Sequence, residues 1–395
     1  MPATSIRPVR GVPSATVAQV LAAREPLVID VRAPVEHAVD CFPGALCVPL
    51  FDDAERALIG TAYRHESPEA AFTRARELMR SHIDPLVRSI AARAGHALGD
   101  AAIEQRFVER TASGFDALQR ELRTQPLDAL PEHAVVLACW RGGMRSRSLA
   151  SFLRELGLER ACILEGGYRA WRAHVAAGLD ALALTPPVFV LRGLTGVGKT
   201  LVLRAIERLR PEWVLDLEAL AEHRSSVLGM VGLTPASQKK FESRLWRRCS
   251  RGFGAAIVLE GESRKIGDAI LPTRLWTALC SGTCIELATT LDRRIDVLLD
   301  DYLEHPDSRT QLRRQLPFIE QRIGPVQWAG KLVALLDEHR ERELVSVLLD
   351  LYYDPLYRHS EKAFSLSTRI DSTSPAHAAR ECIAFIESHL SLRSP

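Results

Sequence analysis

The segment GLTGVGKT at residues 193–200 constrains the fold more than any other part of the sequence, because it fits the pattern G-x-x-x-x-G-K-[ST]. An apolar run of strand length, VFVLR at residues 188–192, precedes it, and a helical pattern at residues 201–209 follows it. In this context the loop N–H groups and the helix N-terminus hold phosphate oxygens, a lysine reaches those oxygens, and a threonine ligates Mg²⁺. The sequence therefore predicts a P-loop α/β domain whose phosphate-binding residues are Gly193, Gly196, Gly198, Lys199 and Thr200.

A second strand-like run, AAIVL at residues 255–259, ends directly before Glu260. In P-loop proteins an acid at the end of a neighbouring strand helps to hold the metal ion. Glu260 is therefore a candidate for metal or phosphate support, with a merely solvated carboxylate as the alternative. Beyond Mg²⁺ held together with phosphates, no metal site and no tightly bound cofactor is predicted, because no cluster of Cys and His has ligand spacing.

The chain of 395 residues is long enough for two domains of ordinary size. The segment GLDALALTPP at residues 178–187 ends in prolines that cannot continue a helix, so we expect domains at residues 1–180 and 186–395. Hydrophobic residues make up 47% of the chain, which excludes a disordered protein. No apolar run has the length of a membrane span and the N-terminus lacks a signal-peptide pattern, so a cytoplasmic protein with no membrane partner is expected.

The first region alternates strand and helix patterns. Three apolar runs of strand length lie at residues 26–31, 133–139 and 161–164. Helical patterns lie before the first run, at residues 17–24, and between the last two runs, at residues 148–156. This alternation is typical of a parallel α/β sheet. Residues 70–130 have apolar positions at helical spacing and no strand signal, so they are predicted to form a helical insertion. The second region is predicted to become mostly helical after Asp292.

The segment CWRGGMRS at residues 139–146 follows one of these strands and precedes a helix that is expected to start near Ser146. A thiol at the head of such a loop is surrounded by backbone N–H groups and by the positive helix end, which favour the thiolate. The predicted catalytic residue is Cys139, and the predicted anion cradle comprises Arg141, Gly142, Gly143, Met144 and Arg145. The alternative, a small buried residue at a strand end, leaves two glycines and two arginines unexplained.

Three further segments of the first region complete a recognisable pattern. They are IDVRAP at residues 29–34, PGA at residues 43–45 leading to VPL at residues 48–50, and LEGGYRAW at residues 164–171. Together with the segment at residues 139–146, and in this order along the chain, they resemble a rhodanese domain. The resemblance implies that Cys139 carries sulfur as a persulfide and that the loop cradles the charged product. The helical insertion departs from an ordinary rhodanese domain.

The second region also contains LEALAEHRSSVLG at residues 217–229, EGESRKIG at residues 260–267 and YYDPLYR at residues 352–358. With the preceding rhodanese-like region, these segments resemble the bacterial tRNA 2-selenouridine synthase family. The resemblance implies a rhodanese-like parallel sheet with a helical insertion, followed by a P-loop NTPase-like α/β domain with a mostly helical C-terminal part. Ser225 stands where the HRGS-type segment of that family usually has Gly.

The resemblance implies a selenotransferase with an associated tRNA geranyltransferase activity. Its substrate would be tRNA carrying 2-thiouridine at the wobble position, converted to 2-selenouridine through S-geranyl-2-thiouridine. Geranyl diphosphate and selenophosphate would be the donors. A diphosphate donor suits a P-loop, and a thiolate in an anion cradle suits a chalcogen carrier. We therefore expect the P-loop domain to serve geranyl transfer and Cys139 to handle selenium, for example as a selenosulfide.

Two other functions remain open at this point. One is a nucleotide-hydrolysing regulator or small-molecule kinase with a rhodanese sensor domain, because a P-loop alone does not define a reaction. Rapid ATP or GTP turnover without RNA would favour it. The other is a plain sulfurtransferase that delivers persulfide sulfur, which thiosulfate-to-cyanide transfer without any role for Lys199 would favour.

A tRNA partner requires a basic surface, yet 51 Lys and Arg against 49 Asp and Glu give a net charge of only +2. The basic surface must therefore be local. One helical pattern around residues 239–251 places five basic residues on one face and apolar residues on another. The predicted tRNA contacts are Lys240, Arg244, Arg247, Arg248 and Arg251, and a solvated helix face is an equally good interpretation.

Overall fold

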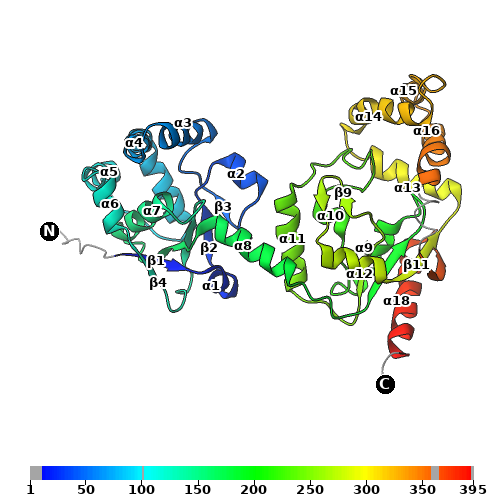
Figure 1. Ribbon diagram of the computed structural model, residues 1–395, viewed down its shortest axis with the longest axis horizontal. Coiled ribbons are helices and arrows are strands. Elements are labelled where there is room, and N and C mark those ends of the chain that lie inside the picture. The colour runs from blue at the N-terminus through cyan, green and yellow to red at the C-terminus, as the bar shows by residue number, and fades with distance from the viewer. Residues whose placement is uncertain (1–10, 100–101, 357–363, 393–395) are drawn as a thin grey trace. The chain divides into compact units, whose positions relative to one another are not determined.

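The structure, a computed structural model, describes residues 11–99, 102–356 and 364–392. Residues 1–10, and Tyr357 and Arg358 at the end of the YYDPLYR segment, lie outside the described residues. The chain divides into two compact units, residues 1–177 and 178–395, which are described separately (Figure 1). Each unit contains a parallel sheet with helices packed against it, which confirms the predicted α/β class.

The first unit is built on a parallel sheet with the strand order β3-β2-β5-β6-β1-β4. The strands are β1 (Val12–Ala15), β2 (Leu27–Asp30), β3 (Leu46–Cys47), β4 (Thr124–Pro126), β5 (Val135–Ala138) and β6 (Ala161–Leu164). Strands β2, β5 and β6 confirm the three predicted runs. The expectation of no strand within residues 70–130 was wrong, because β4 pairs with β1 there. Its residues are all exposed, so no apolar run marks it.

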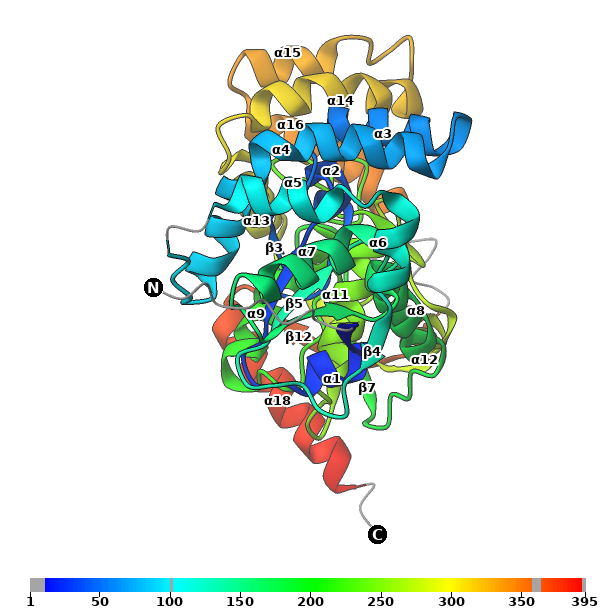
Figure 2. The same ribbon diagram turned by 90° about the vertical axis from the view of Figure 1, so that its left-hand side faces the viewer.

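Helices connect and cover these strands. They are α1 (Val17–Ala22), α2 (Pro34–Val39), α3 (Asp53–His65), α4 (Pro68–Arg93), α5 (Ile103–Thr111), α6 (Phe115–Glu121), α7 (Met144–Glu155) and α8 (Gly167–Asp180). The predicted helical insertion is present and begins earlier than expected, with α3. Asp52 caps α3 in a capping box with Glu55, and Ser67 caps α4, which starts with proline. Figure 2 shows α3 to α6 gathered near α7, and their apolar side chains share one core with β5.

The second unit contains a parallel sheet with the order β12-β11-β7-β8. Its strands are β7 (Val188–Arg192), β8 (Ile257–Glu260), β11 (Thr283–Ala288) and β12 (Leu366–Asp371), and a separate hairpin pairs β9 (Lys265–Ile266) with β10 (Ala269–Ile270). Helices α9 (Lys199–Leu209) and α18 (Pro375–Ser391) contribute to the core under the main sheet. Strands β11 and β12 were not predicted, because Thr283 and Glu286 interrupt the apolar residues of TCIELA and because the largely exposed sequence LSTRID resembles a loop.

The remaining helices of the second unit are α10 (Leu217–Ala221), α11 (Gln238–Ser250), α12 (Thr273–Ser281), α13 (Leu291–Leu303), α14 (Ser308–Ile323), α15 (Lys331–Asp337), α16 (Glu341–Leu348) and the π-helix η1 (Leu349–Tyr353). Helices α13 to α16 and η1 pack around a separate apolar core (Figure 1). This arrangement confirms the mostly helical C-terminal part. Among the described residues, no helix has both the length and the apolar character needed to cross a membrane.

Candidate functional site

The P-loop lies where the motif predicts, between the end of β7 and the start of α9 at Lys199. Three glycines adopt positive φ angles in it: Gly193 at +135°, Gly196 at +83° and Gly198 at +83°. A Cβ at Gly193 would lie 2.3 Å from the carbonyl oxygen of Leu287, and one at Gly196 would lie 2.8 Å from that of Arg294. Glycine is therefore required at these two positions by close backbone approach as well as by φ.

Lys199 and Thr200 of the P-loop each donate a side-chain hydrogen bond to a nearby oxygen. The Lys199 Nζ donates to the carbonyl oxygen of Gly193 at 3.0 Å. The Thr200 hydroxyl donates to the Glu218 Oε2 at 3.4 Å. Both side chains line a cavity of about 770 Å³ beside the loop. The P-loop thus opens onto a space large enough for a phosphate-bearing ligand.

Arg294 of α13 holds the P-loop from outside. Its side chain is only 6% exposed, and its Nε donates to the carbonyl oxygen of Thr195 at 2.8 Å. Its two Nη groups donate to the carboxylate of Asp354 at 3.0 and 2.5 Å. This bidentate pair fixes a guanidinium in one orientation. The YYDPLYR segment, whose role sequence reasoning left open, therefore supports the loop through Asp354.

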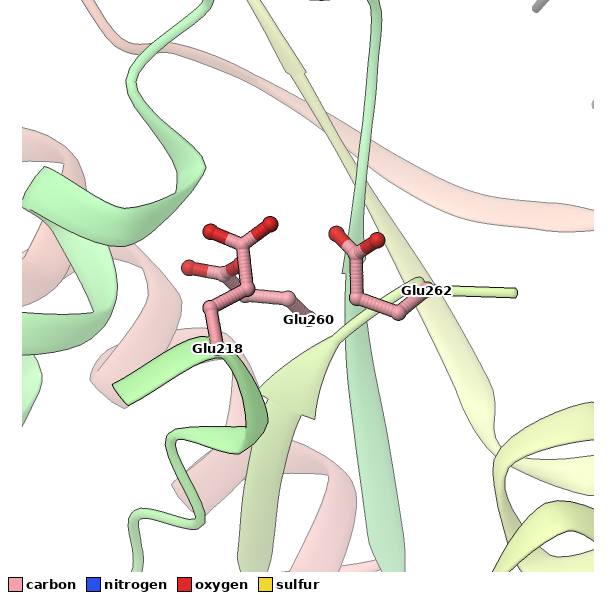
Figure 3. A group of neighbouring side chains, drawn as sticks. All are labelled: Glu218, Glu260 and Glu262. Atoms are coloured by element: carbon pink, nitrogen blue, oxygen red, sulfur yellow. The ribbon is translucent and has the colours of Figure 1, made fainter. Parts of the chain in front are cut away.

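Three carboxylates gather beside Thr200: Glu218 on α10, Glu260 at the end of β8, and Glu262 just after it (Figure 3). One oxygen from each lies within 4.8 Å of the others. Glu260 is 1% exposed, and within the described part of the chain neither of its oxygens accepts a hydrogen bond. Burial, and then the charge of Glu262, raises the pKa of Glu260 to about 8. Burial, followed by the charge of Glu260, raises the pKa of Glu218 to about 10.

These carboxylates fit a divalent cation. Oxygen ligands from carboxylates and hydroxyls are those that Mg²⁺ prefers, and a cation would give the buried Glu260 carboxyl the partner that it lacks among the described residues. Sequence reasoning found Glu260 but missed Glu218 and Glu262. The spacing E-G-E at residues 260–262 was an available signal for the third carboxylate. No sequence signal singled out Glu218, which only the packing of α10 brings to the loop.

The thiol loop, residues 139–146, lies in the first unit. Cys139 follows β5 directly and is 2% exposed. The backbone N–H of Gly143 donates to its Sγ at 3.3 Å, and the Ser146 Oγ lies 3.2 Å from the Sγ. Helix α7 begins at Met144, earlier than expected, so the sulfur lies beside a helix N-terminus. Of the predicted cradle residues, Gly143 contacts the sulfur through its N–H, and sequence reasoning missed Ser146, whose hydroxyl is the second group beside it.

The two predicted cradle arginines differ in their exposure and in their ion pairs. Arg141 is exposed and makes no ion pair with any residue in the described ranges, whereas Arg145 lies 4.0 Å from Glu36. Behind the loop, Gly167 has a φ of +60°, and a Cβ there would lie 2.3 Å from the Cys139 carbonyl oxygen. The N–H of Tyr168 donates to the same oxygen at 2.8 Å. The LEGGYRAW segment therefore packs directly against the thiol loop.

The basic helix α11 presents fewer free charges than its sequence predicts. Lys240 and Arg244 both pair with Glu222, at 3.4 and 2.9 Å. Arg248 donates to the carbonyl oxygens of Val214, Gly252 and Glu212. Among the five predicted tRNA contacts, Arg247 and Arg251 are exposed and make no ion pair within the described ranges. These two arginines are therefore the ones available to a polyanion.

Comparisons with known proteins agree with both units. A rhodanese-like domain matches residues 14–174, and the tRNA 2-selenouridine synthase AAA domain matches residues 186–390. The protein named tRNA 2-selenouridine synthase from Cupriavidus necator is 31% identical, with 83% of this chain and 86% of that protein covered. The protein of the same name from Chromohalobacter salexigens is also 31% identical, with coverages of 84% and 87%. From the thiol loop, the P-loop and these matches along most of its length, it follows that the chain belongs to the tRNA 2-selenouridine synthase family.

Proposed function

We propose that this chain is a tRNA-modifying selenotransferase that converts wobble 2-thiouridine to 2-selenouridine through S-geranyl-2-thiouridine, with geranyl diphosphate and selenophosphate as donors. The observation that carries the proposal is that one chain contains two anion sites of different chemistry. One holds a thiol beside a helix N-terminus, and the other is a P-loop with uncompensated carboxylates. Both relatives reported above are named tRNA 2-selenouridine synthase, which supports the formation of 2-selenouridine in tRNA.

In the first step the P-loop would bind the diphosphate of the geranyl donor. Its backbone N–H groups and Lys199 stabilise the negative charge that grows on the diphosphate as the carbon–oxygen bond breaks. The sulfur of 2-thiouridine forms the new bond to the geranyl carbon, and the nucleoside loses its N3 proton to water. Lys199 and the loop therefore act on the leaving group.

Mg²⁺ would be held by Thr200 and by the carboxylates of Glu218, Glu260 and Glu262. When bound, it would supply positive charge against the diphosphate oxygens. The protein residues contribute the site itself, because their buried carboxylates orient oxygen ligands before the cation arrives.

The second step would take place at Cys139, where the cradle handles selenium. Selenium from selenophosphate forms a bond to C2 of the nucleoside, the C2–S bond breaks, and geranylthiol leaves with a proton that the Cys139 thiol donates. Water takes up the phosphoryl group, so selenium keeps its oxidation state. The Gly143 N–H donates to the Cys139 Sγ and the Ser146 Oγ lies 3.2 Å from it, so both groups would stabilise this sulfur as a thiolate.

The test is to incubate the protein with 2-thiouridine RNA and each donor separately, followed by nucleoside mass analysis. We expect geranyl diphosphate alone to give S-geranyl-2-thiouridine and later addition of selenophosphate to give 2-selenouridine. Lys199→Ala should abolish the first product, and Cys139→Ser should block only the second. Rapid ATP or GTP turnover without RNA, or thiosulfate-to-cyanide transfer independent of Lys199, would instead support one of the two alternative functions.

A further inference from the structure

An apolar cavity of about 120 Å³ lies inside the first unit, between the helical insertion and α7. Its walls are formed mainly by aromatic and aliphatic side chains, including Phe51, Phe72, Met79, Phe107, Leu118 and Phe152. The cavity is open to solvent along part of its wall, and an apolar surface left uncovered in this way commonly marks a binding site. An unfilled apolar space of this size is therefore a feature that requires an explanation.

The apolar cavity adjoins the thiol loop. Met144 and Arg145 line it, and they also begin α7 directly after Gly143, whose N–H donates to the Cys139 sulfur at 3.3 Å. Cys139 itself belongs to the same hydrophobic core as Phe51, Met79 and Phe152. Met144 and Arg145 therefore connect the cavity to the loop that holds Cys139.

Three polar residues that line the apolar cavity make hydrogen bonds or ion pairs with other protein groups. The Thr111 hydroxyl donates to the Phe107 carbonyl oxygen at 2.8 Å, and the Ser148 hydroxyl donates to that of Met144 at 2.7 Å. Arg110 pairs with Glu155 and Glu121. The cavity therefore offers a ligand mainly hydrophobic contact, which favours an alkyl chain over a polar group.

The charged groups at the apolar cavity fit a ligand whose other end is an anion. Arg76 lines the cavity and makes no ion pair within the described ranges, and the Arg145 side chain is 32% exposed. Guanidinium groups of this kind bind phosphate. The combination of an apolar space and two arginines matches an alkyl chain attached to a nucleotide.

We propose that the apolar cavity binds the alkyl chain of the S-alkylated nucleoside during the selenium step. The inserted helices α4, α5 and α6 would thereby form the chain-binding wall of the Cys139 site. The inference rests on the proposed function, which supplies the alkylated intermediate. Because the chain leaves with sulfur when the C2–S bond breaks, the cavity binds the leaving group and distinguishes alkylated RNA from 2-thiouridine RNA.

The experiment compares the affinity of one short RNA carrying either S-geranyl-2-thiouridine or 2-thiouridine. We expect the protein to bind the geranylated RNA at least tenfold more tightly. Ala75→Phe, which fills the cavity from α4, should reduce this preference to less than twofold and leave binding of 2-thiouridine RNA unchanged. Ala92→Phe is the matched control, because Ala92 is an exposed alanine of the same helix, and it should retain the full preference.

A second measurement covers the case in which Ala75→Phe does not fold. Affinity of the unaltered protein for RNA with S-methyl, five-carbon S-prenyl and S-geranyl groups should rise with chain length, because each buried carbon adds to the hydrophobic contribution. Equal affinity across this series, or full preference in folded Ala75→Phe, would overturn the inference even if 2-selenouridine is formed. Absence of any geranylated or selenated product would reject the proposed function, which is a separate outcome.

Discussion

Two glycines next to the thiol differ sharply in what a side chain would meet. At Gly167, φ is +60° and a Cβ would collide with the Cys139 carbonyl oxygen, whereas at Gly143, φ is −88° and a Cβ would meet nothing within 4 Å. Gly167→Ala should therefore lower the free energy of unfolding by roughly 2 kcal/mol or more and abolish selenium incorporation. Gly143→Ala should change stability by less than about 0.5 kcal/mol. Thermal unfolding and nucleoside analysis check both, and equal behaviour of the two variants would contradict this account of the loop.

The buried carboxyl of Glu260 predicts a pH dependence of stability in the metal-free protein. Its pKa is raised to about 8 in the folded state, against 4.5 ordinarily, so the folded protein keeps a proton that the unfolded chain releases. Stability should consequently fall as pH rises from about 4.5 to 8. Glu260→Gln should make this fall shallower and raise the free energy of unfolding at pH 8 by roughly 2–5 kcal/mol, with little effect near pH 4.5.

Urea unfolding between pH 4.5 and 8 measures this effect. Glu207→Gln is the control, because Glu207 is an exposed residue of α9 and its replacement should leave the pH profile unchanged. Addition of Mg²⁺ should stabilise the unaltered protein at pH 8 more than the Glu260→Gln variant. Identical pH profiles for the unaltered protein and Glu260→Gln would show that the carboxylate is not desolvated as described.

The sequence correctly predicted the positions of residues that belong to a local motif. The P-loop glycines, Lys199 and Cys139 all lie where their motifs predict a loop between a strand and a helix. It failed for Glu218 and Ser146, whose positions depend on how a helix packs or where it starts. Ser225 is an intermediate case. Its φ of +25° is unusual for a residue with a side chain, and the family usually has Gly at this position.

At the scale of single elements, α11 yields a prediction about RNA binding. Replacement of Arg247 and Arg251 by Gln should weaken tRNA affinity and reduce the slope of log affinity against log salt by about 2, if each arginine contacts one phosphate. Arg208→Gln with Arg274→Gln removes the same charge from exposed positions elsewhere in the second unit and should have little effect. An unchanged salt slope for the α11 variant would exclude the helix as an RNA contact.

The sequence predicted the strands that are short, uninterrupted runs of buried hydrophobic residues. Strands β2, β5, β6, β7 and β8 are buried and apolar, and all were expected. Strands β4 and β12 are largely exposed and were missed, because their place in a sheet depends on backbone pairing with distant strands. Strand β11 was also missed, because Thr283 and Glu286 interrupt its buried apolar residues. Strand β1 is buried but short and contains proline, so its apolar signal is weak.

At the scale of the whole molecule, each unit has its own hydrophobic core. The core around β5 contains only residues of the first unit, and the cores around β7 and α14 contain only residues of the second. We therefore predict that separate fragments of residues 1–182 and 186–395 each fold and unfold cooperatively, as measured by circular dichroism and calorimetry. Failure of either fragment to show a thermal transition would mean that the units depend on each other for stability.

The strand order of the first unit has a consequence for synthesis of the protein. Strand β1 lies inside the sheet between β6 and β4, and its pairing joins Ser14 to Ile163. A growing chain can pair one edge of β1 with β4, but it must keep the other edge unpaired until β6 has left the ribosome. Contacts between such distant residues slow folding because a long loop has to close first. During translation this strand is a ready target for chaperones, and a pause before residue 164 would prolong that exposure.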